Sequence, residues 1–226
     1  MPEKPRSLPA LFAACLVTAG CTATAVPDPA PPPPPAGLTA TLVTPLDITL
    51  RWPDDPAAAG TALEFATDPN GPYTTLQYLP SHVTTYTHPD LLPQTSFYYR
   101  TRSFSGPASA PATDGTLPTP PAPGDAAVPV RSPGDAAAPA EPRVARTADG
   151  TLRFTWRDRS TDEEGFLLEQ RKPGTAVFAP VEVTGANTTS CELSALPGEE
   201  GSAYRVRAFV TGPPSPLAHQ TTGAQR

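Results

Sequence analysis

One acidic stretch carries the densest group of side chains with chemical potential. Asp158, Asp162, Glu163 and Glu164 lie within a few residues of one another. Carboxylates of this kind ligate calcium, and paired carboxylates cleave glycosides when they face each other across a cleft. The stretch lacks the D-x-D-x-D-G spacing of a calcium loop. We interpret it as a solvated turn, with calcium ligation as the alternative.

A second group combines His82, His88 and Asp90. A histidine and an aspartate activate a serine in hydrolases, but the chain has no G-x-S-x-G turn to present such a serine. These residues are therefore expected to lie in a surface loop. No glycine-rich phosphate loop is present either. The sequence predicts no catalytic residues and no cofactor, so we expect the protein not to be an enzyme.

The three cysteines exclude other chemistry. Cys15 and Cys21 lie at the N-terminal end and Cys191 lies far downstream, without a C-x-x-C pair. Neither a structural zinc site nor an internal disulfide is expected from this spacing. The formal charge is −6, and lysines and arginines are scattered, so the sequence predicts no metal site and no nucleic-acid partner.

The N-terminal residues have the order of an export signal. Lys4 and Arg6 precede an apolar run from Leu8 to Ala19, which is shorter than the roughly 20 residues that a membrane span needs. Ala19, Gly20 and Cys21 then resemble the lipobox of bacterial lipoproteins, which implies cleavage before Cys21 and acylation of its thiol. The alternative is an ordinary signal peptide cleaved near residues 23–25, with Cys21 incidental.

Proline-rich segments flank the first half of the remaining chain. Residues 31–35 are all proline, which favours an extended polyproline II spacer, and a ligand for an aromatic groove is the alternative. A second segment, 118–142, repeats PGDAA and contains almost no large apolar side chain. Since it has little to bury, we expect it to be a disordered linker.

Comparison of the chain with itself reveals a repeat. ITLRWPDD corresponds to LRFTWRDR, and FYYRTRSF corresponds to SAYRVRAF. Trp52 and Trp156 occupy equivalent places, as do Tyr99 and Tyr204. Within TLRFTWR, apolar and polar residues alternate with the period of a half-buried strand. Short alternating segments between Gly, Pro, Asn and Asp turns predict antiparallel β-sandwiches.

The second copy resembles fibronectin type III domains. WRDRSTDEEGF is similar to a W-x-D-x-S-x-x-E-x-G-F stretch of bacterial members, and LPGEEGSAYRVRA is similar to the run that leads into their sixth strand. The resemblance implies an all-β fold of two antiparallel, Ig-like sandwiches. The expected organisation is a signal peptide at 1–20, a Pro-rich tether at 21–37, a first sandwich at 38–118, a disordered Pro/Ala/Gly linker at 119–140, a second sandwich at 141–222 and a tail at 223–226.

The alignment also predicts a core and two departures from the family. The tyrosine that ties one corner of such domains is replaced by Phe97 and Ser202, so another group must hold each corner. Cys191 aligns with Tyr86, which indicates a buried, inert thiol rather than a reactive one. The predicted core residues are Trp52, Tyr86, Leu91, Phe97, Trp156, Phe166, Leu196, Tyr204 and Val206.

These features predict an exported envelope lipoprotein, anchored to the outer membrane or cell surface through acylated Cys21. Its sandwiches would act as spacers and as modules that bind an envelope or extracellular protein. The alternative is an accessory protein that binds carbohydrate or cell wall beside secreted hydrolases. Aromatic side chains exposed on one face of the first sandwich would favour that alternative, and Tyr98 is expected to point outward.

Overall fold

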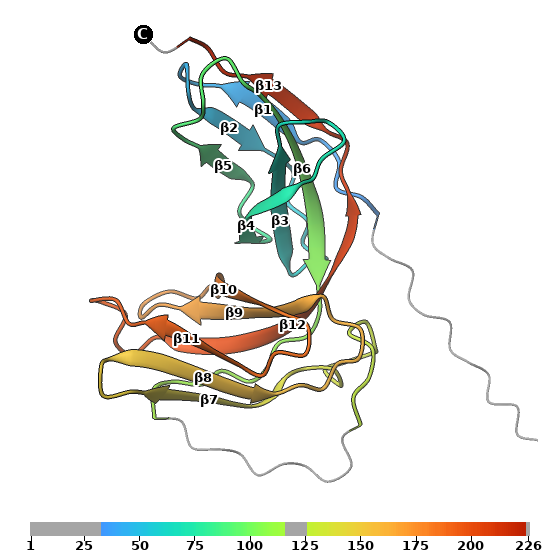
Figure 1. Cartoon of the computed structure of the whole chain (residues 1–226). Helices are drawn as coiled ribbons and strands as arrows, with labels where there is room; N and C mark the ends of the chain where they lie inside the picture. The colour runs from blue at the N-terminus through green and yellow to red at the C-terminus, as the bar shows by residue number, and fades with distance from the viewer. Residues whose placement is uncertain (1–32, 116–125, 225–226) are drawn as a thin grey trace, which may run out of the picture.

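The computed structural model describes residues 33–115 and 126–224, which form strands and loops (Figure 1). The thirteen strands are β1 Thr39–Leu42, β2 Ile48–Arg51, β3 Gly60–Ala66, β4 Thr74–Pro80, β5 Thr85–His88, β6 Ser96–Ser105, β7 Ala140–Arg146, β8 Thr151–Arg157, β9 Gly165–Arg171, β10 Ala179–Gly185, β11 Ser190–Ser194, β12 Ala203–Pro214 and β13 Ala218–Thr221. The predicted signal peptide, Cys21 and most of the predicted first tether lie outside the described residues.

The strands form three antiparallel sheets. Strands β1, β2 and β5 make one outer sheet, and β11, β8 and β7 make the other. Between them runs a seven-stranded sheet in the order β10-β9-β12-β6-β3-β4, with β13 also paired to β6. Each outer sheet faces its own part of this central sheet, so the chain forms two sandwiches that meet at an angle (Figure 1).

Side-chain alternation explains the strands and the two cores. Along β6 the side chains of Phe97, Tyr99 and Thr101 are buried, whereas Tyr98 and Arg100 between them are partly exposed. The first core gathers around Trp52 and Tyr99, and the second around Trp156 and Tyr204. The predicted core residues that are buried are Trp52, Leu91, Phe97, Trp156, Phe166, Tyr204 and Val206, and Tyr86 packs partly buried against the first core.

Leu196 corrects the predicted core. Its side chain is 59% exposed, although its repeat equivalent Leu91 is 7% exposed. In the second sandwich, Leu193 and Ala195 pack against the core before the chain reaches Leu196. The turn that begins there therefore needs no apolar anchor, and Leu196 points to solvent.

Other groups hold the two corners. In the second sandwich, Gln170 Nε2 donates to Ser202 Oγ and to Tyr204 Oη, both at 3.2 Å. In the first, the buried ring of Phe97 stacks on Tyr99, whose hydroxyl bonds with His88 Nδ1 at 3.1 Å. A side-chain hydrogen bond therefore holds one corner, and aromatic packing holds the other.

Residues 126–139 do not behave as a disordered linker. Val128 pairs with Ser160, and the Val130 backbone N–H donates to Asp162 Oδ1 at 2.6 Å. Val130 is 2% exposed and belongs to the second core. The two valines supply the apolar surface that the rest of the proline-rich segment lacks, and this part of the segment packs against the second sandwich.

The sandwiches exchange their last strands. After β6, residues 107–112 cross to the second sandwich, where Ala108 pairs with Arg207 and Ala112 with Tyr204. From Thr211, which is still within β12, the chain crosses to the first sandwich and follows β6 as far as Thr221, with Thr211 opposite Phe104 and Ala218 opposite Tyr99. The first sandwich therefore consists of residues 33–106 and 211–224, and the second of residues 107–115 and 126–210.

Candidate functional site at the junction of the sandwiches

The two crossings are clamped by equivalent arginines. Arg102 on β6 donates from Nε to the carbonyl of Gly212 at 2.7 Å. Arg207 on β12 donates from Nη1 to the carbonyl of Gly106. Each arginine therefore fixes the glycine at which the other strand enters its sandwich. The two repeats therefore make equivalent contacts at the two crossings.

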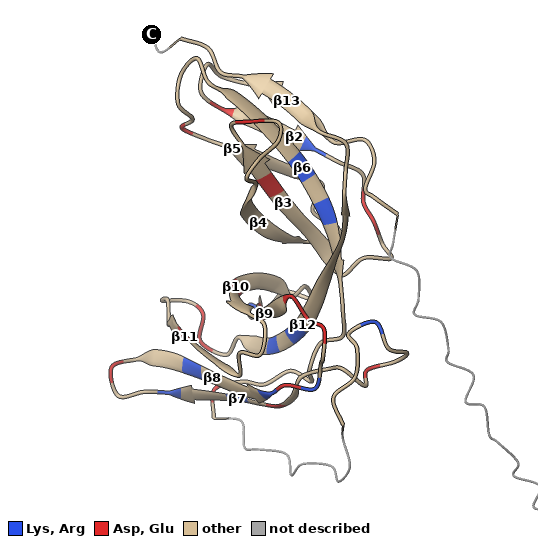
Figure 2. Cartoon of the chain, turned by 45° about the vertical axis from the view of Figure 1, so that its right-hand side comes forward, with Lys and Arg blue, Asp and Glu red and all other residues tan. Residues whose placement is uncertain are grey.

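A carboxylate positions Arg207, and carboxylates also pair with neighbouring arginines of the central sheet. Arg207 Nε also donates to Glu169 Oε1 at 2.8 Å, and Glu169 is 2% exposed. Arg205 pairs with the same carboxylate, and its repeat equivalent Arg100 pairs with Glu64. Figure 2 shows these basic bands on β6 and β12 beside the acidic band on β3. Because a buried carboxylate needs such partners, the charges here order the central sheet.

An aromatic cluster fills the centre of the junction. Phe104 and Phe209, which are repeat equivalents, meet edge to face with ring centroids 6.2 Å apart. Tyr78 packs edge to face on both, at 5.8 Å and 5.4 Å. Leu167 is fully buried in the same cluster. The halves thus share a small core of their own, which favours a fixed angle between them.

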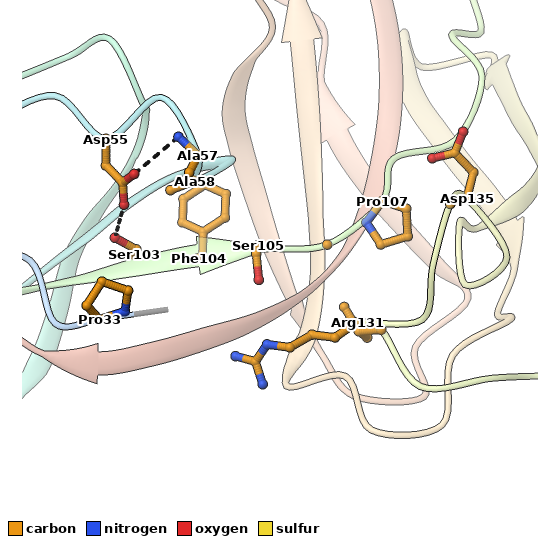
Figure 3. Close-up of a pocket in the computed structure, with 13 residues that line it drawn as sticks. Pro33, Asp55, Ala57, Ala58, Ser103, Phe104, Ser105, Pro107, Arg131 and Asp135 are labelled. Atoms are coloured by element: carbon orange, nitrogen blue, oxygen red, sulfur yellow. Dashed lines mark hydrogen bonds between the residues drawn. The ribbon is translucent and has the colours of Figure 1, made fainter. Parts of the chain in front are cut away.

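A cavity of about 570 Å³ opens beside this cluster (Figure 3). It lies where the end of β6, the loop after β2 and the packed segment after residue 126 meet. Its apolar lining includes Phe104, Pro107 and Val130, and its polar lining includes Asp55 and Arg131. The volume is in the range of pockets that bind ligands, which often lie between domains.

The polar groups of the cavity differ in how they are engaged. Asp55 accepts hydrogen bonds from Ser103 Oγ at 2.9 Å and from the Ala57 backbone at 3.2 Å. Arg131 donates from Nη2 to the Thr211 carbonyl at 3.3 Å, whereas its buried Nε has no hydrogen-bond partner among the described residues. Asp55 therefore shapes the wall, and Arg131 links the packed segment to the crossing at Thr211.

The acidic stretch serves as a structural clamp. Asp158 accepts from the backbone and hydroxyl of Ser160, and Asp162 holds Val130. Glu163 accepts from the Asn187 backbone at 2.9 Å, and Glu164 accepts from the Thr211 backbone at 2.8 Å, at the crossing itself. In residues 33–115 and 126–224, no group of His, Cys, Asp and Glu side chains is arranged to hold a metal ion.

His82, His88 and Asp90 do not form a catalytic group. His82 is exposed, whereas the partly buried His88 lies among the rings of Phe65, Phe97 and Tyr99. Burial lowers the pKa of His88 below its usual 6.5. Asp90 lies in an exposed turn, where its backbone N–H donates to Asp47. His88 is therefore a packing residue of the first sandwich.

Cys191 is a partly buried thiol that packs against the second core. Burial raises its pKa to about 12, with a smaller contribution from Glu182 and Glu192. The thiol therefore remains protonated near neutral pH, and a protonated thiol is a poor nucleophile.

Within the part of the chain that the structure describes, no helix is long and apolar enough to cross a membrane.

Sequence reasoning missed the junction. The signal that was present is a repeated Gly-Pro-x-Ser-x-x-Ala, at residues 106–112 and 212–218. It marks a last strand in each repeat, but it does not say which sandwich that strand joins. Arg131 and Val130 were also missed, because they lie in a segment whose composition indicates disorder.

The strand order is that of fibronectin type III-like sandwiches. Among solved structures, the chain is similar to an Fn3-like protein from Clostridium thermocellum, with 30% identity over 34% of this chain and 79% of that one, and a TM-score of 0.31. A two-domain fibronectin type III segment of chicken tenascin matches with 13% identity over 84% and 99% of the two chains, and a TM-score of 0.28. Chicken CNTN1 FN1–FN3 domains match with 16% identity over 86% and 68%, and a TM-score of 0.30. No protein-family model and no curated protein sequence matches the chain.

Proposed function

We propose that this chain is a non-enzymatic, exported lipoprotein of the cell envelope that binds a partner protein at the junction of its sandwiches. Cys21 would carry the lipid, the Pro-rich tether would act as spacer, and the clasped sandwiches would present the binding surface. The lipobox-like Ala19-Gly20-Cys21 supports the anchor, and the fibronectin type III-like fold is that of a binding module.

The observation that carries the binding role is the cavity beside the crossings. Both sandwiches and the packed segment contribute to it, so its shape depends on their fixed arrangement. Pro107, Phe104 and Val130 provide an apolar wall, and Arg131 provides a cationic rim. An apolar side chain of a partner, flanked by an acceptor for Arg131, matches this lining.

The tyrosines of the first sandwich favour a protein partner over a glycan. Tyr73 lies beneath Arg100, with 3.9 Å from the guanidinium carbon to the ring centroid. Tyr98 stacks on His219 with 4.6 Å between centroids, and Tyr78 belongs to the junction core. Sugar stacking needs an open aromatic face, whereas these rings are engaged by neighbouring side chains.

Crosslinking in the native envelope tests the binding role. A photoreactive side chain replaces Ala58, which lines the cavity, and a control variant carries it at Gly185, which has open space around it on β10. We expect one protein to be crosslinked from Ala58 and not from Gly185, and Arg131→Gln to weaken that product. Crosslinking to glycan would support the carbohydrate alternative. Equal labelling from both positions by a folded chain would contradict the proposed site.

The anchor has its own test. Cells that express the chain are labelled with a fatty-acid analogue, and the chain is then extracted with detergent. We expect label on the wild-type chain and none on Cys21→Ser. A wild-type chain that is exported and cleaved after residue 21 without label would show an ordinary signal peptide instead.

A further inference from the structure

The two exchanged strands make the same bonds to their acceptor strands. The Ser109 backbone N–H donates to the Val206 carbonyl at 2.8 Å, and Ser109 Oγ accepts from the Val206 N–H at 3.1 Å. Ser215 makes the same two bonds with Thr101, at 2.8 Å and 3.0 Å. Val206 and Thr101 are repeat equivalents. Each acceptor strand therefore recognises the same short motif.

The prolines in the crossings explain why neither strand folds back on its own sandwich. Strand β12 continues without a turn through Pro213 and Pro214 into the first sandwich. Proline fixes φ near −65°, and a residue before proline prefers an extended backbone. Gly212 and Pro213 both precede proline. The chain therefore passes through the second crossing without a turn, although its pairing is irregular between Thr211 and Pro214, whereas the first crossing runs through Gly106 at a φ of +141°.

The exchange divides the chain into two complementary halves, residues 33–115 and 126–224. Each half supplies most of one sandwich and the closing strand of the other. Residues 116–125 are the covalent connection between them. The contacts between halves, including the arginine clamps and the Phe104–Phe209 pair, would form equally well if the halves came from different molecules.

We propose that a second copy of this chain is a partner, bound through the interface between residues 33–115 and residues 126–224. Residues 33–115 of one copy associate with residues 126–224 of the other, and the reverse pair closes the dimer. Every strand pairing of the monomer is kept in this dimer. The balance between monomer and dimer is therefore set mainly by the concentration of the chain. Within one chain, the effective concentration of the second half is on the order of millimolar for a short linker. The monomer therefore dominates in dilute solution, and the exchanged dimer grows as the local concentration approaches that value.

Engineered cysteines distinguish the two forms in the full chain. Ser96 and Thr221 are paired across β6 and β13, with their hydroxyl oxygens 3.0 Å apart, so cysteines there are placed to form a disulfide. One population carries Ser96→Cys and the other Thr221→Cys, each in a Cys15→Ala, Cys21→Ala, Cys191→Ala background. The two are unfolded, mixed, refolded at about 0.01 mM or about 1 mM and oxidised.

We expect a disulfide-linked pair of chains whose yield rises about tenfold or more between these concentrations. A chain with both substitutions should form its disulfide internally in dilute solution, which shows that the site is competent. Ser96→Cys mixed with Gly185→Cys measures random collision. A linked pair no more abundant than in that control, with both chains refolded, would overturn the proposal.

Discussion

The two sandwiches repeat one sequence pattern but differ in how the chain completes them. The second is built from residues 107–115 and 126–210, which follow one another along the chain. The first requires residues 33–106 together with residues 211–224, which come from opposite ends of the fold. Two similar repeats therefore need not fold equally independently. The position of the closing strand along the chain decides which sandwich can be completed only after the other.

The closing strands also differ in how firmly they are attached. The strand that completes the first sandwich pairs along β6 and continues into a terminal staple, where the Gly223 backbone N–H donates to Pro45 at 2.8 Å and its carbonyl accepts from Gln94 at 3.0 Å. The strand that completes the second makes isolated bridges at Ala108 and Ala112. The first sandwich thus depends more strongly on its distant strand.

Removal of residues 211–226 should have the largest effect on this difference. The truncated chain loses β13, which pairs with β6 at Tyr99, and the hydrogen bonds of Gly223, so we expect the first sandwich to unfold. The second sandwich retains residues 107–112 and should remain folded, with a lower midpoint of urea unfolding. Tryptophan fluorescence reports each sandwich separately when Trp52→Phe or Trp156→Phe leaves one of the two tryptophans. Unfolding of both sandwiches together would show that neither folds without the other.

The crossing at Gly106 gives the next effect. Its φ is +141°, and a Cβ there would lie 2.0 Å from the Ala208 carbonyl oxygen. We expect Gly106→Ala to lower the free energy of unfolding by about 3 kcal/mol. Gly115→Ala is the matched control, because Gly115 also has a positive φ but open space around it. Similar losses in urea melts would mean that backbone strain, rather than the close approach, limits the site.

The paired serines compare the two closing strands directly. Ser109→Ala leaves the Val206 N–H without its hydroxyl acceptor, and Ser215→Ala does the same to the Thr101 N–H. Each substitution should cost about 1–2 kcal/mol. We expect the loss from Ser215→Ala to be reported mainly by Trp52 and the loss from Ser109→Ala by Trp156. Identical responses of both tryptophans to either change would indicate one fully cooperative unit.

Acidification should weaken the first sandwich selectively. Because burial lowers the pKa of His88, the folded state binds fewer protons than the unfolded state below pH 6.5. The contribution of His88 to the free energy of unfolding therefore falls as pH decreases from about 6.5. The decrease is at most about 1.4 kcal/mol per pH unit, and it ends once the lowered pKa of His88 is passed. In the second sandwich the uncharged Gln170 holds the equivalent tyrosine. The pH dependence of urea midpoints reported by Trp52 should flatten in His88→Gln, and an unchanged slope would assign it to other groups.

The all-β fold and the repeat were predictable because alternation in segments such as TLRFTWR reflects one buried and one exposed face. The exchange was not predictable, since the same Gly-Pro-x-Ser-x-x-Ala motif satisfies either acceptor strand. Leu196 was wrongly predicted to be buried, because it aligns with the buried Leu91 but lies in a turn that follows a different path. Val130 and Arg131 were hidden by composition, which does not register two valines placed to reach a neighbouring core.

The position of β13 at the end of the strand order determines when the first sandwich can be completed during synthesis. A chain emerges from the ribosome N-terminus first, so β1 to β6 are complete long before their last partner exists. Until residue 221 has emerged, the β6 edge that β13 will cover is open along Ser96–Tyr99. A chain that stops early keeps this edge exposed, where proteases and aggregation act on it. Since β13 follows every strand of the second sandwich along the chain, the first sandwich can close only after the second has been synthesised.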